Sequence, residues 1–456
     1  MVAPPLSEIL RVAGGSEMVE VTRTAIPTCC GNSFQLTASI EALNGTCYCL
    51  SLNEAALRLR LEVDLGTRGL SHDMVESHRD LFASVPMFVS HAHLAEMAQV
   101  IRVVEEVVQK PQFRRAVSAW APEIASFDPL SRGGLLGYDF HLTATGPQLI
   151  EINTNPGGAL LNVVLGGAQH ACCADAAGLV MAPMAAAGFE SALFEIFSAE
   201  WKCQRNDAPL RSIAIVDETP EQQYLYPEFL LYQHFFAHHG IDVIICDPRE
   251  LDRKDGRLWH QGRPIDFVYN RLTDFALQDP AHVALRIAYL AREVVVSPHP
   301  RAHALYADKR NLTLLCDERF LRGAGVTDES VSTLVARIPH TELVTPENTD
   351  RLWAKRRALF FKPAAGYGSK AAYRGDKLTK RVWGETAKGA YVAQVRVDPS
   401  ERRVAKAQTS GPLKVDIRNY AYDGVVKLVA ARLYKGQTTN FRTLGGGFAP
   451  VFSENV

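Results

Sequence analysis

The stretch QLIEINTNPGGALLN, residues 148–162, decides how the rest of the chain is interpreted. Leu149 and Ile152 are typical of a buried strand, yet Glu151 and Asn153 interrupt the apolar pattern just before a Pro-Gly-Gly turn. Alternate residues of a strand share one face, so this carboxylate and this amide are expected side by side. Neighbouring hard oxygen donors of this kind are suited to Mg²⁺.

A third oxygen donor, Asp139, lies in the preceding strand-like segment GYDFHL. The Thr-Gly-Pro sequence at residues 145–147 predicts a hairpin that sets Asp139 beside Glu151. Two neighbouring carboxylates repel each other unless a cation lies between them. We therefore predict that Asp139, Glu151 and Asn153 bind a metal ion, with water and phosphate oxygens completing its coordination.

Composition is that of a soluble globular protein, with 456 residues, 47% hydrophobic and 22% charged residues, and a formal net charge of -1. This length predicts several structural units. The near-neutral charge favours neither nucleic acid nor a membrane surface as partner. No apolar run approaches the roughly 20 residues that span a bilayer, and no signal peptide is recognised, so we expect a cytoplasmic location.

The nine cysteines do not form a recognisable metal or disulfide motif. Their number is odd, and no Cys-x-x-Cys pair occurs. Several are adjacent or alternating, at Cys29-Cys30, Cys47-x-Cys49 and Cys172-Cys173, which is poor geometry for zinc. We interpret the cysteines as small buried residues.

The chain divides into four predicted regions. Residues 1–130 are mainly helical, 131–205 hold the predicted metal-binding strands and Ala-rich helices, 206–300 form an α/β unit, and 301–456 hold further strands joined to glycine-rich or charged segments. The third region opens with strand, long helix, Gly240 and strand, which predicts a βαβ unit.

Ligands of such open sheets bind beyond the carboxyl ends of the strands. Arg271 directly follows the strand FVYN at such an end. A role in the site and a surface salt bridge are both open for this residue.

The stretch FFKPAAGYGSKAAY, residues 360–373, combines an apolar strand that delivers Lys362 with a glycine-rich loop. Gly366, Gly368 and Ser369 let backbone N–H groups approach an anion, and the lysine supplies a point charge for phosphate. A hairpin turn with a surface lysine is the alternative interpretation.

The motifs KPAAGYGS, DIR and GYDF…EINTNPG together resemble the ATP-grasp superfamily. In that superfamily a lysine and a glycine-rich loop cover the ATP phosphates, and an Asp…Glu-x-Asn set holds magnesium. The stretch ADKRNLTLL resembles the segment before the lid domain, which implies that Lys309 also contacts ATP. Because Glu151 and Asn153 precede both lysines, the order resembles the circularly permuted branch, which includes eukaryotic-type glutathione synthetase and glutathionylspermidine synthetase-like ligases.

The resemblance covers about residues 135–456 and implies an α/β (α+β) fold, namely a permuted ATP-grasp fold with a Rossmann-like domain and a helical N-terminal region. The loop KPAAGYGSK lacks the glutamate that permuted glutathione synthetases use as a metal ligand, which favours Asp139 as the third ligand. The implied nucleotide-binding residues are Lys309, Lys362, Gly366, Gly368, Ser369, the hinge residues Gln394 and Val395, and Glu401 for the ribose.

Four arginines are the implied catalytic and substrate-binding residues. Arg271 and Arg442 match positions that hold the acid substrate, and Arg432 matches an arginine near the acyl phosphate. Arg418 matches a phosphate contact, with an internal salt bridge to Asp416 as the alternative.

The resemblance implies an ATP- and Mg²⁺-dependent carboxylate–amine ligase that forms an amide through an acyl phosphate and releases ADP. A pair of Mg²⁺ ions is expected, with Mn²⁺ as an alternative metal, and the substrates are expected to be amino acids or small peptides. The arrangement also fits two alternatives, an ATP-dependent phosphotransferase acting on a small molecule and a non-catalytic ATP-binding regulatory protein. The N-terminal region is expected to shape the second-substrate pocket or to form a homodimer contact.

Overall fold

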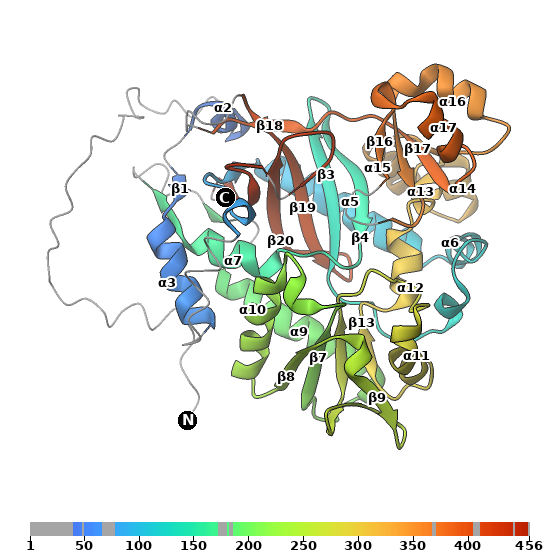
Figure 1. Cartoon of the computed structure of the whole chain (residues 1–456). Coiled ribbons are helices and arrows are strands. Elements are labelled where there is room, and N and C mark those ends of the chain that lie inside the picture. Colours follow the sequence, from blue (N-terminus) through green and yellow to red (C-terminus); the bar gives the residue numbers. More distant parts are fainter. Residues whose placement is uncertain are drawn as a thin grey trace, which may run out of the picture.

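The computed structural model describes residues 40–47, 50–65, 78–171, 180–181, 186–366, 371–404, 411–440 and 443–454. Within these residues the chain forms a large central sheet, a parallel sheet below it and a smaller antiparallel sheet at its upper right (Figure 1). No described helix is long and apolar enough to cross a membrane.

The central sheet joins strands from distant parts of the chain. Its order is β2 (Met87–Phe88), β21 (Gly447–Ser453), β20 (Val425–Tyr434), β19 (Leu413–Tyr422), β3 (Leu136–Thr143) and β4 (Gly146–Asn153), with β18 (Ser400–Arg402) beside β19 and β6 (Val180–Met181) beside β21. The pairing of β19 with β3 sets Arg418 opposite Asp139. The C-terminal strands therefore lie directly beside the predicted metal-binding hairpin.

The predicted hairpin is confirmed by the antiparallel pairing of β3 with β4, in which Asp139 lies opposite Glu151. The chain turns at residues 144–145. The register shifts next to this pair, because Phe140 pairs with Leu149 and leaves Ile150 as an extra residue. A bulge of this kind turns a backbone group out of the ladder and re-aims neighbouring side chains.

Helices cover both faces of the central sheet. On one face, α5 (His91–Val108) packs Met97, Val100 and Val104 against Phe140 and Ile417. On the other face lie α7 (Ala159–Gly167) and α9 (Ala186–Arg205), which pack against the Tyr420 end of β19. Asp416 and Arg418 alternate with Ile417 and share the face of Tyr420, so this second face is apolar at one end and charged at the other.

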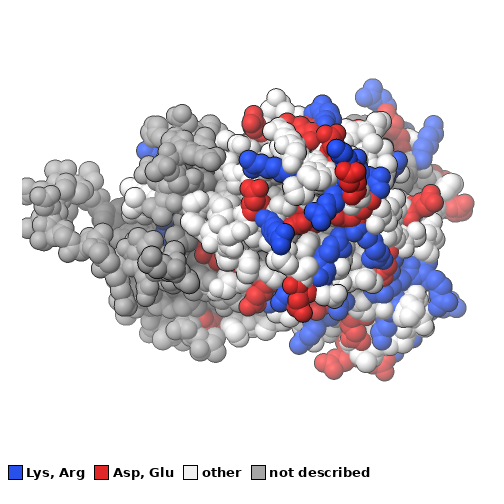
Figure 2. All heavy atoms as spheres, turned by 90° about the horizontal axis from the view of Figure 1, so that it is seen from below, with Lys and Arg blue, Asp and Glu red and all other residues white. Residues whose placement is uncertain are grey.

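The predicted βαβ unit is confirmed in the parallel sheet β13 (Val295–Ser297), β12 (Phe267–Asn270), β7 (Ser212–Val216) and β8 (Asp242–Cys246). Helix α10 (Tyr226–His238) connects β7 to β8. A three-stranded sheet of β9 (Leu251–Lys254), β10 (Arg257–His260) and β11 (Arg263–Ile265) follows. Seen from this end, the described surface carries both acidic and basic side chains (Figure 2).

The smaller antiparallel sheet carries Lys362 and Gln394. Its strands are β14 (Thr341–Leu343), β17 (Tyr391–Val395), β15 (Leu359–Pro363) and β16 (Tyr373–Arg374). Helices α16 (Thr349–Lys355) and α17 (Lys380–Thr386) belong to the same unit, with Leu352 and Phe361 in its core. Lys309 reaches this unit through its backbone N–H, which donates to the carbonyl of Ala364 at 2.9 Å.

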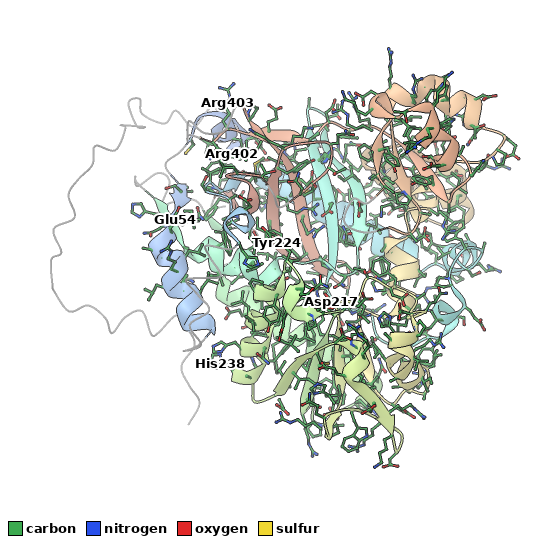
Figure 3. All side chains as sticks on the ribbon, viewed as in Figure 1. Glu54, Asp217, Tyr224, His238, Arg402 and Arg403 are labelled. Atoms are coloured by element: carbon green, nitrogen blue, oxygen red, sulfur yellow. The ribbon has the colours of Figure 1, made fainter. Side chains whose placement is uncertain are left out.

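The described N-terminal part contains α2 (Leu43–Thr46), α3 (Glu54–Leu65), α5 and α6 (Pro111–Val117), together with the short strands β1 (Leu50–Leu52) and β2. Arg402 on β18 is fully buried and donates to the carbonyls of Pro86 (2.8 Å), Asn44 (2.9 Å) and Cys47 (2.7 Å). Figure 3 shows it at the top of the molecule, where these contacts fasten the N-terminal segment to the central sheet.

Candidate active site

A cavity of about 560 Å³ lies where the three main sheets meet. It brings together most of the predicted site residues, namely Asp139, Glu151, Asn153, Arg271, Lys309, Lys362, Gly366, Gln394, Val395, Arg418 and Arg432. Glu401 is exposed on β18 and is not among the lining residues. Gly368, Ser369 and Arg442 lie outside the described residues.

Asp139 holds two arginines at the charged end of the central sheet. Its carboxylate accepts from Arg418 Nε and Nη2 (2.7 Å each), Arg432 Nη2 (2.8 Å) and Asn153 Nδ2 (2.9 Å). Burial alone would raise the pKa of Asp139, but Arg418 and Arg432 outweigh it and hold this pKa below its usual value. A carboxylate has about four acceptor sites, so Asp139 can bind a metal ion only by giving up one of these contacts.

Glu151 and Asn153 fit a hard cation better than Asp139 does. Glu151 Oε1 lies 3.6 Å from Lys309 Nζ, and both residues line the cavity. The amide nitrogen of Asn153 is used by Asp139, which leaves its oxygen as the atom that can face an ion. A carboxylate and an amide oxygen from one strand end are a suitable partial donor set for Mg²⁺.

Lys362 is held in place by the bulge and by Gln394. Its Nζ donates to the Ile150 carbonyl at 2.7 Å and to Gln394 Oε1 at 2.8 Å. Burial, together with Lys309, lowers the pKa of Lys362 to about 8, although Glu151 opposes the shift. An ammonium has three donors, so one remains for an anion in the cavity.

Lys309 and Gln394 stabilise this arrangement from two sides. Lys309 Nζ donates to the Gly366 carbonyl at 2.9 Å, which ties the start of the glycine-rich loop to the cavity. Gln394 Nε2 donates to Thr341 Oγ1 at 3.1 Å, so the buried Gln394 amide is fixed with its oxygen toward Lys362. The side chain of this hinge residue therefore positions Lys362.

Asp416 anchors Arg432 from the other side. It accepts from His141 Nε2 (2.9 Å), Tyr434 Oη (2.9 Å) and Arg432 Nη2 (3.3 Å), and it also contacts Thr439. Burial raises the pKa of Asp416, but the bond and charge of His141 and the charge of Arg432 lower it well below its usual value.

The salt bridge between Asp416 and Arg418, which the sequence left open, is not formed. Arg418 forms a salt bridge with Asp139 on β3, whereas Asp416 pairs with Arg432 and His141. Two arginines are thus fixed beside the cavity by carboxylates before any ligand binds.

Arg271 and Asp217 approach the cavity from the carboxyl ends of the parallel strands. Arg271 donates to the Tyr269 hydroxyl at 3.0 Å and lies over the Phe229 ring at 5.7 Å. Asp217 lies where the parallel sheet meets the central sheet (Figure 3), and burial raises its pKa to about 6 although Arg271 opposes the shift. Asp217 Oδ1 accepts from the Glu218 backbone N–H at 2.9 Å, and the charge of Arg271 interacts with the buried Glu228 and with Asp217.

Sequence reasoning missed Asp217. It named other polar residues at these strand ends, including Arg271, but Asp217 is the first polar residue after the buried strand β7. That position was the available signal. A carboxylate and a guanidinium that face one cavity are suited to a ligand carrying both charges.

Comparisons with known proteins support the fold alone. No family model matches the chain, and no curated protein matches it. A glutathione synthetase-like effector from Globodera pallida is similar in structure, with a TM-score of 0.52 and 8% identity, over 88% of this chain and 97% of that one. A putative gamma-glutamylcysteine synthetase from Methylobacillus flagellatus gives a TM-score of 0.43 and 13% identity, over 79% and 87%. The ATP-grasp ligase PsnB gives 0.27 and 16%, over 52% and 87%.

The predicted fold class is therefore confirmed, since the chain has a mixed helix-and-sheet fold similar to that of the glutathione synthetase-like effector. The circular permutation stays a prediction. Along the chain, the hairpin with Glu151 comes first, the parallel sheet second, the sheet with Lys362 third, and β19 to β21 return to the central sheet.

Proposed function

We propose that this chain is an ATP- and Mg²⁺-dependent ligase that joins a carboxylate to an amine and releases ADP. The supporting observation is the charge arrangement around one cavity. Lys309 and Lys362 lie on one side of the cavity, near Glu151 on β4. Arg418 and Arg432 lie on the central sheet, and Arg271 follows β12 of the parallel sheet. This is the set of groups that phosphoryl transfer to a carboxylate requires.

The nucleotide would occupy the side of the cavity formed by the smaller sheet. Lys309 and Lys362 would contact its phosphates, and backbone groups at Gln394 and Val395 would face the adenine. Glu151 and Asn153 would hold Mg²⁺, which when bound neutralises charge on phosphate oxygens. Gly366, whose carbonyl accepts from Lys309 Nζ at 2.9 Å, would lie beside these phosphates at the edge of the cavity.

The acid substrate would be oriented by Arg271. A carboxylate oxygen of the acid substrate attacks the γ-phosphorus of ATP. The bond between this phosphorus and the bridging oxygen of ADP breaks, and an acyl phosphate forms. Arg418 and Arg432 stabilise the negative charge of this step. Because Asp139 and Asp416 already fix them, little reorganisation is needed when the charge develops.

The amide forms in the second step. The amine attacks the acyl carbon, inorganic phosphate leaves, and the nitrogen loses a proton to solvent. Asp217 would bind an ammonium group of the acid substrate while Arg271 binds a carboxylate. This supports an amino acid or small peptide as the acid substrate.

The test is ADP release by the purified chain with ATP and Mg²⁺ against amino acids taken in pairs, with mass analysis of the products. A ligase needs both substrates and gives a condensed product. A phosphorylated product formed without an amine would identify a phosphotransferase, and ATP binding without turnover on any pair would favour a regulatory protein.

Asn153→Ala should abolish turnover, whereas Lys388→Met, at an exposed position of the same sheet unit, should leave it unchanged. Full activity of the Asn153 variant would show that the proposed metal site is wrong. Comparable loss in both variants would instead indicate a general effect on folding.

A further inference from the structure

A second group of metal-binding side chains lies outside the cavity, where the parallel sheet meets the three-stranded sheet β9–β11. Cys246 ends β8, Glu250 ends the short 3-10 helix Pro248–Glu250, and His260 ends β10. One ligand atom from each side chain lies within 4.8 Å of the others. We infer that Cys246, Glu250 and His260 form a zinc site.

Local structure explains why these residues meet. Asp247 caps the 3-10 helix through a capping box with Glu250, which turns the chain sharply after β8. In the β9–β10 hairpin His260 pairs with Leu251, the residue directly after Glu250. The hairpin thus brings His260 back to the turn, although it is distant from Cys246 in the sequence.

The three donors suit Zn²⁺ in type and spacing. His260 Nε2 lies 3.8 Å from Glu250 Oε2. Zn–S and Zn–N bonds of about 2.3 and 2.0 Å place the ligand atoms of a tetrahedral site roughly 3.3–3.7 Å apart. Small side-chain rotations would therefore close the site, and a water molecule would be the fourth ligand.

Two of the donors have no competing hydrogen bond. Neither the Cys246 thiol nor the His260 ring forms one with another residue in the described part of the chain. Glu250 accepts a hydrogen bond from the Asp247 backbone at 3.0 Å through Oε2 and keeps further acceptor capacity. Cys246 is buried, while the Glu250 side chain is 48% exposed, so an ion would enter past Glu250.

The surroundings favour a cation. The carboxylates of Glu250 and Asp247 both act on the Cys246 thiol through their negative charge. When the ion binds, the thiol proton is released to solvent as the Zn–S bond forms. The ion then balances the thiolate and the neighbouring carboxylate.

Such a site would stiffen the edge of the proposed substrate pocket. Asp247 Oδ2 accepts from the Thr219 backbone N–H at 2.8 Å, and Thr219 lies two residues after Asp217. The site would therefore connect β8, the β9–β10 hairpin and the loop that carries Asp217.

The test uses Co²⁺ as an optical probe for the zinc site in the full chain. A thiolate ligand gives a near-ultraviolet charge-transfer band that oxygen ligands such as Glu151 and Asn153 cannot produce. The band should appear with the wild-type protein and disappear in Cys246→Ser. Cys203→Ser, at an exposed cysteine of α9, should retain it.

His260→Gln should weaken Zn²⁺ binding at least about 100-fold, because even loss of an outer-sphere partner typically costs 10–100-fold. Circular dichroism reports whether Cys246→Ser is folded. If it folds poorly, His260→Gln provides the test instead. A wild-type protein without the band, or a band of unchanged intensity in Cys246→Ser, would overturn the inference.

Discussion

Gln394 gives the sharpest test of how the site works, because its amide oxygen lies 2.8 Å from Lys362 Nζ. Gln394→Glu places a buried carboxylate at that position and should raise the pKa of Lys362 from its value of about 8. Gln394→Met removes this acceptor and leaves the Ile150 carbonyl, at 2.7 Å, to accept from Lys362 Nζ. The pKa of Lys362 should then fall further.

The magnitude follows from the lysine–phosphate contact. A hydrogen bond to a charged group contributes about 1.5–3 kcal/mol, which corresponds to a pKa in the ATP complex about one to two above that of the free protein. Lys362 carries its charge below a pH of about 8. The dissociation constant of ATP should therefore be flat below this pH and rise by about 10–100-fold above it.

Calorimetric titration of ATP between pH 6 and pH 10 measures the position of this rise. We expect the rise at higher pH in Gln394→Glu, at lower pH in Gln394→Met, and at the wild-type position in Lys388→Met. If all four proteins weaken at the same pH, Lys362 is not the titrating group and Gln394 does not position it.

Four further predictions concern the site and its support. Glu151→Gln should lose Mg²⁺-dependent ADP release while ATP binding without Mg²⁺ persists, as measured by calorimetry; an unchanged Mg²⁺ dependence would argue against Glu151 as a ligand. Activity should fall as the pH drops below about 6, because Asp217 then takes up a proton, and Asp217→Asn should remove this limb and raise the KM of the acid substrate. The same variant should stabilise the fold near neutral pH by up to about 3 kcal/mol in urea unfolding, since the raised pKa of Asp217 costs stability wherever the group is ionised. Gly158→Ala should lower the free energy of unfolding by about 2–4 kcal/mol, because φ is 96° and the new Cβ would lie 2.2 Å from Phe448. The control Gly240→Ala, with φ of 76° and no neighbour within 4 Å, should lower it by about 1 kcal/mol. Equal losses would contradict the steric argument.

The hairpin that contains Asp139 and Glu151 shows which structural features can be predicted from local sequence patterns. Strand alternation and turn residues act over a few positions, so they predicted which side chains share a face and that these two strands pair. They did not predict the bulge at Ile150, which turns a carbonyl toward Lys362, because that contact comes from another sheet.

What the sequence by itself determined is the set of local units and the donors at their ends, including Glu151, Asn153, Lys362 and the βαβ unit. Only the tertiary structure decided the partners. Asp139 meets Arg418 across 279 residues, and no local period encodes which distant strands become neighbours. That choice depends on burying the apolar faces of the whole chain at once, and the charged partners follow from the strand order that results.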